Sequence, residues 1–304
     1  MDLPVTMRLK AWFMSSVVTR LVKAPSLTLT TRSVGQPETV YVPTRHGRVR
    51  CFITRPPDDA PLASGPSTPV HINIHGGAFL IGAPHQDEHL VKAIAGEVGA
   101  YVVNVDYSRA PKVRYPQAHE ECFDVLRWVA DTGPERGWDG RSISISGTSA
   151  GGNLALATLE QARRAGGPNV LAGVLFVPAV DVTVPPEDYV SDIPKPFVGP
   201  GMVRLMQEAY FPEEYRRSEV LASPALADEE LASLPPLLVF AAEHDTIRPQ
   251  IERFVQRCKA RGIHVDYGCI QGADHDFQVN EKVAARVLPD VAKKMTTHLI
   301  RARR

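Results

Sequence analysis

Residues 142–156 read SISISGTSAGGNLAL, and this stretch decides how the rest of the chain is interpreted. The alternation of serine and isoleucine up to Ser146 predicts a strand, and the residues from Asn153 onward predict a helix. Between them lies a Gly-x-Ser-x-Gly pattern centred on Ser149. Glycines two residues before and after a serine permit a sharp strand-to-helix turn that exposes its hydroxyl. We therefore predict that Ser149 is a nucleophile and that the N–H of Ala150 faces an oxyanion formed there.

A serine hydroxyl is a poor nucleophile and needs a nearby base, which an acid must orient. After a turn of this kind the acid and then the histidine follow the serine along the chain. The histidines after Ser149 are His244, His264, His275 and His298. His264 falls in a strand pattern and His298 in the terminal helix, whereas His275 follows the last predicted strand directly. We predict that His275 is the base; the alternative is a polar histidine of a loop.

Three carboxylates compete for the role of the acid. Asp245 follows the apolar run of residues 237–242 and precedes a helical pattern, so it stands at the end of a predicted strand. Glu243 is two residues away, and Asp181 ends the preceding strand. We predict Asp245 as the acid that fixes the histidine tautomer, with Glu243 left as the alternative.

A strand that runs into two glycines supplies the remaining part of the predicted site. Residues 70–74 are apolar or β-branched in alternation with polar residues, and His75, Gly76 and Gly77 follow. Glycines there allow the N–H groups of Gly76 and Gly77 to approach an oxyanion together with that of Ala150. His75 is expected to brace this loop. His71 and His75 are four residues apart on a predicted strand, which is not the spacing of a metal site. His85 and His89 could share a helical face but have no evident third ligand, so no metal and no cofactor is expected.

Strand and helix patterns alternate along the chain, which predicts a mostly parallel, doubly wound α/β sheet covered on both faces. Strands are predicted at 49–55, 70–74, 101–105, 142–146, 173–177, 236–242 and 264–270, and helices at 89–98, 120–130, 153–164, 250–261 and 283–301. The stretch 182–234 breaks this rhythm with seven prolines and scattered apolar residues. A long insert after a strand is usually functional, so we predict a cap over a substrate pocket.

An apolar stripe of Leu9, Phe13, Val17 and Leu21, with Trp12 beside it, predicts an amphipathic helix near the N-terminus. The interpretation favoured here is a helix that packs over the mouth of the site. A helix lying on a membrane surface is the alternative, which four flanking cations support only weakly.

The composition restricts partners and compartment. Lys and Arg together number 34 and Asp and Glu together number 34, so the formal net charge is zero. This balance gives no electrostatic reason to expect nucleic acid as a partner. No apolar run reaches the roughly 20 residues of a membrane span, and membrane association is not expected. The four cysteines are scattered and the N-terminus lacks a cleavage site, so a cytoplasmic protein with free thiols is expected.

Several separated segments together resemble one family, the hormone-sensitive-lipase-like branch of the α/β-hydrolases, bacterial family IV. The matching segments are His75–Phe79, Val105–Pro111, Tyr115–Pro116, Gly147–Asn153, Leu234–Pro236, Glu243–Asp245 and His275–Phe277. Thr148 resembles the subgroup with Gly-Thr-Ser-Ala-Gly, whereas many members have aspartate there. Ala78 stands where many members have a third glycine, and Thr246-Ile247 replaces the usual Pro-Leu.

This resemblance implies an α/β-hydrolase fold with an eight-stranded, mostly parallel sheet and a helical cap. We predict a single domain over residues 1–304, with a cap from about 1–45 and 182–234. The implied activity is hydrolysis of carboxylic esters with short-to-medium acyl or aryl groups through an acyl-serine intermediate. An amidase, a deacetylase or a lipase would use the same triad, and a non-catalytic small-molecule receptor could share the fold. Dimers are common in the family, so a homodimer is also expected.

Overall fold

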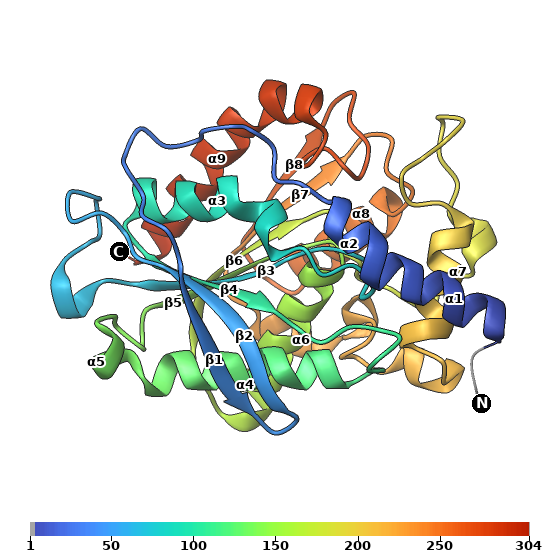
Figure 1. The fold of residues 1–304 in the computed structure, drawn as a ribbon, viewed down its shortest axis with the longest axis horizontal. Coiled ribbons are helices and arrows are strands. Elements are labelled where there is room, and N and C mark those ends of the chain that lie inside the picture. The colour runs from blue at the N-terminus through green and yellow to red at the C-terminus, as the bar shows by residue number, and fades with distance from the viewer. Residues whose placement is uncertain (1–3, 304) are drawn as a thin grey trace.

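The sheet at the centre of the molecule contains all the strands of residues 4–303, the part of the chain that a computed structural model describes (Figure 1). The strands are β1 (Glu38–Thr44), β2 (Gly47–Thr54), β3 (Val70–Ile74), β4 (Tyr101–Asp106), β5 (Ile143–Thr148), β6 (Val170–Phe176), β7 (Leu237–Ala242) and β8 (Val265–Ile270). Their order is β1-β2-β4-β3-β5-β6-β7-β8. The sheet thus has eight strands, as predicted.

The strands β4, β3, β5, β6, β7 and β8 run parallel, whereas β2 pairs antiparallel with both of its neighbours, β1 and β4. Every residue of β3 and β7 is buried. A strand buried on both faces needs helices above and below it, and β7 is accordingly wholly apolar, while the polar His71 and Asn73 of β3 are hydrogen-bonded to Ser146 on β5. The carboxyl ends of the parallel strands meet at one edge, where loops after β3, β5, β7 and β8 lie together.

Helices cover the two faces of this sheet (Figure 1). The helices of residues 4–303 are α1 (Val5–Phe13), α2 (Thr19–Leu21), α3 (Glu88–Ala93), α4 (Gln117–Asp131), α5 (Gly133–Arg136), α6 (Ala150–Ala165), α7 (Pro200–Tyr210), α8 (Arg248–Ala260) and α9 (Glu281–Arg303). In the view of Figure 1, α3 and α9 lie above the sheet, and α4 and α6 lie below it. The predicted α/β architecture is therefore present.

Two segments differ from the sequence prediction in their local structure. Residues 38–44, which the prediction placed within the cap, form β1 and pair with β2 along their whole length. The insert at 182–234 is not wholly irregular, because it contains α7 and several short 3-10 turns. Helix α1 packs against α7, so the N-terminal segment and the insert meet above the sheet edge.

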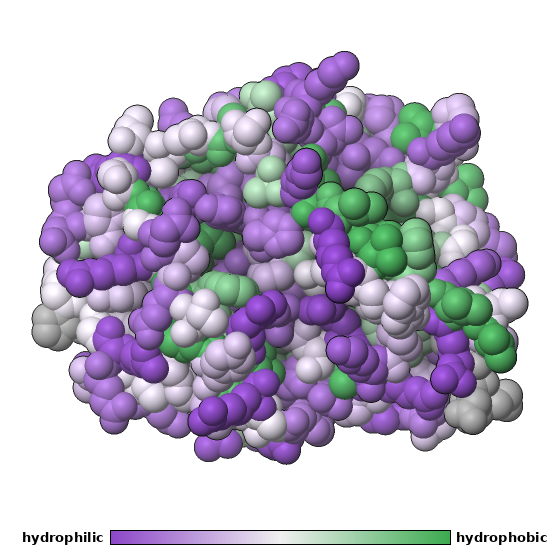
Figure 2. All heavy atoms as spheres, viewed as in Figure 1, coloured by the Kyte–Doolittle hydropathy of each residue, from purple (hydrophilic) through white to green (hydrophobic). Residues whose placement is uncertain are grey.

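The apolar stripe predicted near the N-terminus lies on the face of the helix that does not pack. Leu9 is 60% exposed and Phe13 is 50% exposed, whereas Ala11 is buried. Met7 and Met14 lie against the core on the packed face. A π-helical turn, η1 (Met14–Val18), follows α1 and changes the angular spacing of side chains. Figure 2 shows the resulting apolar surface over α1 and its continuation.

Candidate active site

Ser149 occupies the turn between β5 and α6 with φ 54° and ψ −116°, a backbone conformation that is rare for residues other than glycine. Its N–H donates to the carbonyl of Phe176, at 2.8 Å, which ties the turn to β6. A Cβ at Gly147 would lie 2.1 Å from the carbonyl oxygen of Gly151, and a Cβ at Gly151 would lie 2.0 Å from that of Ile74. Neither position can carry a side chain, so the two glycines permit this turn.

His275 and Asp245 lie beside Ser149, brought there by the loops that follow β8 and β7. The Nδ1 of His275 is 2.7 Å from Oδ2 of Asp245, and its Nε2 is 2.8 Å from Oγ of Ser149. The other oxygen of Asp245 accepts the N–H of Ile247 at 3.1 Å. With Nδ1–H donating to the carboxylate, Nε2 is left to accept the serine proton.

Two opposing effects act on the imidazole of His275. Burial lowers its pKa, but the charge of Asp245, the hydrogen bond to it and the nearby charges of Asp274 and Asp276 together raise the pKa above its usual value. A buried carboxylate beside the ring favours the protonated form because the two opposite charges attract. The arrangement therefore favours proton transfer from Ser149 to His275.

The competing acids and histidines have other partners. Glu243 accepts the N–H of Gly272 at 2.7 Å and so braces the loop before His275. Asp181 accepts from Thr183, and the Nδ1 of His244 lies 2.9 Å from Asp192. Of the carboxylates that the sequence left open, the structure brings Asp245 to His275.

The loop after β3 lies against the serine turn. A Cβ at Gly76 would be 3.5 Å from Cβ of Ser149, and Gly77 has φ +135°. The ring of His75 stacks on Tyr107 at 4.5 Å and its Nδ1 is 2.6 Å from the carbonyl oxygen of Gly76. Burial lowers the pKa of His75 to about 4, so the ring is neutral and braces the loop.

Gly76 and Gly77 line the cavity beside Ser149, and Ala150 follows Ser149 at the start of α6. Within residues 4–303, none of their three backbone N–H groups donates to an oxygen of a neighbouring segment. Unengaged N–H groups beside a serine hydroxyl are what an oxyanion needs.

A second serine–histidine pair lies deeper in the sheet, and its geometry is different. The two ring nitrogens of His71 are each 2.8 Å from a serine hydroxyl, those of Ser144 and Ser146. Burial lowers the pKa of His71 to about 3. Both strands are paired on each side here, so Ser146 belongs to a buried polar network and not to the cavity.

The cavity beside Ser149 has a volume of about 320 Å³. Its apolar wall comes from separate parts of the chain: Met14, Val18, Val22, Ala78, Ile81, Phe197, Val198, Met202 and Val279. The ring of Phe197 stacks 6.1 Å from that of His275. Its polar wall includes Gln86, Asp87, Thr148 and Gln278. Sequence reasoning did not find Asp87 or Gln278; the only signal for Gln278 is its position three residues after His275.

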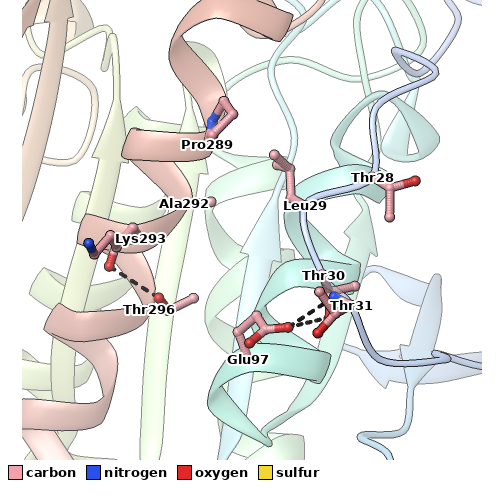
Figure 3. A pocket seen from close by; sticks show the side chains of 9 residues that line it. All are labelled: Thr28, Leu29, Thr30, Thr31, Glu97, Pro289, Ala292, Lys293 and Thr296. Atoms are coloured by element: carbon pink, nitrogen blue, oxygen red, sulfur yellow. Dashed lines mark hydrogen bonds between the residues drawn. The ribbon is translucent and has the colours of Figure 1, made fainter.

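A second hollow, of about 410 Å³, lies between the N-terminal segment, Glu97 and α9 (Figure 3). Its carboxylate is already engaged, because Glu97 accepts from Thr30 at 2.6 Å and from Arg32 at 2.9 Å. No residue of this hollow lines the cavity beside Ser149. It therefore contributes nothing to the candidate site.

Residues 4–303 contain no group of three or more His, Cys, Asp or Glu side chains that could hold a metal ion. Over the same residues, no helix is both long enough and apolar enough to cross a membrane.

A family model described as the α/β-hydrolase fold matches residues 71–279, the segment that carries the serine turn, the glycine loop and the histidine. The chain belongs to the α/β-hydrolase family. Its place in the hormone-sensitive-lipase-like branch is confirmed, whereas the Gly-Thr-Ser-Ala-Gly subgroup stays a prediction.

Relatives and solved structures with named activities are esterases. The carboxylesterase NlhH of Mycobacterium tuberculosis is 28% identical over 202 residues, which cover 65% of this chain and 63% of NlhH. An arylesterase of Saccharolobus solfataricus is 30% identical over 71% of this chain and 70% of its own length. An esterase structure from Pyrobaculum calidifontis has a TM-score of 0.80 at 28% identity, covering 99% of this chain and 94% of the other. The matched part of the chain thus spans less than two thirds of NlhH, while the whole fold is shared with the Pyrobaculum esterase.

Proposed function

We propose that this hydrolase is a serine carboxylesterase that acts on esters with short-to-medium acyl or aryl groups. The observation that carries the proposal is the hydrogen-bonded series from Ser149 through His275 to Asp245, which opens on a cavity. The cavity volume of about 320 Å³ lies at the small end of ligand sites, which suits short substrates. The esterase names of the relatives support the same activity.

The proposed reaction begins when Oγ of Ser149 attacks the ester carbonyl while Nε2 of His275 takes the serine proton. The carbonyl oxygen becomes an oxyanion, which the N–H groups of Gly76, Gly77 and Ala150 stabilise. Collapse of this intermediate breaks the bond to the alkoxy group, and His275 gives its proton to the departing alcohol. Water, deprotonated by His275, then attacks the acyl-serine, and the carboxylic acid leaves as the serine regains its proton.

The segments around the cavity suggest a cap. We propose that residues 5–22 and the insert 182–234 act together as one, because α1 packs against α7 and both segments contribute to the cavity wall. As proposed here, the cap ends before β1.

A cytoplasmic location and a homodimer belong to the same proposal. Cys51, Cys122 and Cys258 are buried free thiols and Cys269 is a half-buried one, which suits a reducing compartment. The zero net charge gives no reason to expect a nucleic-acid partner. Light scattering coupled to size-exclusion chromatography measures the oligomeric state.

The proposed activity is tested with p-nitrophenyl esters of increasing acyl length. Removal of the nucleophile in Ser149→Ala is expected to reduce kcat by about a millionfold, to the background left by binding and the oxyanion donors. The exposed Ser233→Ala serves as a matched control and should keep full activity. A fluorophosphonate probe is expected to label the parent chain at Ser149. Absence of both hydrolysis and labelling would instead favour a non-catalytic receptor.

A further inference from the structure

Two polar atoms in the cavity wall have no hydrogen-bond partner among the described residues. They are Oδ1 of Asp87 and Nε2 of Gln278. Both side chains line the cavity beside Ser149, and the residues are only 1% and 3% exposed. A buried polar atom without a partner costs free energy, so such atoms in a ligand cavity indicate that a ligand supplies the partner.

Other polar side chains of this wall have hydrogen-bond partners within the protein; Asp276, for example, accepts an amide N–H of Asn280 at 3.3 Å. The amide N–H of Gln86 donates to the carbonyl of Gly76 at 3.1 Å. The hydroxyl of Thr148 donates to Oε1 of Gln278 at 3.0 Å. With its oxygen engaged in this bond, Gln278 is left with an amide nitrogen that can donate but has no partner.

A series of hydrogen bonds through the sheet holds Asp87. Asn73 donates its amide N–H to Oδ2 of Asp87 at 3.2 Å and accepts the hydroxyl proton of Ser146 at 2.8 Å. Because Ser146 donates to Asn73, it accepts from His71, whose other nitrogen then accepts from Ser144. All donors in this series point toward Asp87, so one carboxyl oxygen is fixed and the other remains unengaged.

The sheet register places the hydrogen-bond partners of these two cavity-lining side chains on neighbouring strands. Asn73 on β3 is the direct neighbour of Ser146 on β5. Thr148 lies two residues further along β5 and so faces the same side of the sheet as Ser146. Asp87 is bonded to the first of these strands and Gln278 to the second, which gives both a rigid support.

The carboxyl of Asp87 can accept a hydrogen bond when ionised and donate one when protonated. Burial raises its pKa to about 7, against an opposing effect of the bond from Asn73. At Gln278 the nitrogen only donates. A hydroxyl group matches this pair, because its oxygen accepts from Gln278 while its proton goes to Asp87.

We propose that Asp87 and Gln278 form a subsite that binds a hydroxyl group carried by the ester substrate. This inference rests on the proposed esterase function and names a substrate class for it, hydroxyl-bearing esters. Apolar side chains, among them Met14, Val18 and Ile81, make up much of the remaining wall, so the subsite adds a polar anchor to a largely apolar lining.

The test compares hydroxyl-bearing esters with methyl-bearing esters of nearly the same shape. In the acyl arm, p-nitrophenyl 3-hydroxybutyrate is compared with p-nitrophenyl 3-methylbutyrate. In the alkoxy arm, 2-hydroxyethyl butyrate is compared with propyl butyrate. We expect kcat/KM to favour the hydroxyl compound by about tenfold or more in one arm, since a site built to hydrogen-bond a hydroxyl discriminates against its absence. The arm that responds identifies which side of the ester occupies the subsite.

Variants then assign the preference to the two side chains. Asp87→Leu and Gln278→Leu should each remove the preference, whereas the exposed Asp131→Asn, at the end of α4, should retain it. Asp87→Asn keeps the shape and the bond from Asn73 but presents an N–H to the cavity. The subsite of this variant then offers two donors, which match a ketone oxygen that only accepts. Asp87→Asn should therefore have a higher kcat/KM for the p-nitrophenyl ester of 3-oxobutyrate than for that of 3-hydroxybutyrate, and general unfolding cannot produce such a preference.

The outcomes separate the subsite from the activity on which it rests. Equal kcat/KM within both pairs, with normal hydrolysis of the methyl-bearing esters, overturns the subsite and leaves the esterase proposal intact. A preference that persists in Asp87→Leu also overturns it. No hydrolysis of any of the four esters overturns the esterase proposal itself.

Discussion

At Ser149 one residue combines a strained backbone with a place in the cavity wall, and its neighbours make that combination possible. The left-handed φ of 54° costs free energy, which contacts around the turn must offset. The hydrogen bond to Phe176 and the close approach of Gly151 to Ile74 are such contacts. The pattern of glycines in the sequence was sufficient to predict this residue because the steric requirement is local.

The acid could not be assigned from sequence with the same certainty, and the structure gives a physical test between the two candidates. Removing the charge in Asp245→Asn should lower kcat by roughly ten-thousandfold, because the histidine loses the partner that orients and stabilises its charged form. The pKa of His275 is raised mainly by Asp245 against burial, so the variant should have a lower pKa. The base acts unprotonated, so kcat/KM falls at low pH as His275 becomes protonated. This fall is expected above pH 6.5 in the parent chain and at lower pH in the variant.

Glu243→Gln is the matched control, measured in the same pH series. Glu243 contacts the N–H of Gly272, and a glutamine oxygen can still accept that bond. The control should keep the parent pH profile. If Glu243→Gln shifted the pH profile and Asp245→Asn did not, the acid would be Glu243.

At the level of elements, strands were predicted correctly where burial imposes a strong apolar pattern, and the strand at the edge of the sheet was missed. Strand β3 was predicted with its bounds because all of its residues are buried. Strand β1 was missed because only Val40 and Val42 are buried in it and Pro43 follows. The packed face of the N-terminal helix was assigned wrongly, because Leu9 and Phe13 are exposed whereas Met7 and Met14 lie against the core.

The N-terminal helix offers a test of which face borders the cavity. Val18 lines the cavity wall, whereas Leu9 is largely exposed. Val18→Phe adds volume to a cavity of about 320 Å³ and should reduce kcat/KM for a hexanoate ester relative to an acetate ester by about tenfold or more. Leu9→Phe adds an aromatic ring to the outer face of the same helix and should leave that ratio unchanged. Equal effects of the two substitutions would mean that the helix does not border the substrate.

For the whole molecule, the mostly parallel α/β sheet and the serine–acid–histidine order could be predicted because both follow from the order of patterns along the chain. The cavity wall could not, because it is assembled from the N-terminal helix, the loop after β3, the insert and the loop after β8. Asp87 illustrates the difference. Its carboxyl is unusual only because the fold buries it beside Asn73, which the sequence does not reveal.

One buried network joins the insert to the rest of the molecule. The amide of Asn153 on α6 donates to the carbonyls of Ala179 and Ala222, at 2.7 and 2.8 Å. Its oxygen is 2.9 Å from Nε2 of His119 on α4, whose Nδ1 is 3.1 Å from the hydroxyl of Tyr210 at the end of α7. Burial lowers the pKa of His119 to about 4, so its neutral ring donates to Asn153 and accepts from Tyr210.

Asn153→Ala should therefore destabilise the whole molecule and not only the first turn of α6. The substitution leaves two carbonyls and the N–H of His119 buried without partners, which should lower the free energy of unfolding by about 3 kcal/mol. Urea unfolding followed by tryptophan fluorescence measures this, with the exposed Asn169→Ala as the control that should change stability little. Since Ala222 and Tyr210 both belong to the insert, limited proteolysis of folded Asn153→Ala should cut within 182–234 faster than in the control. Equal cutting rates, or equal stabilities of the two variants, would mean that the insert is held to the core by its apolar packing alone.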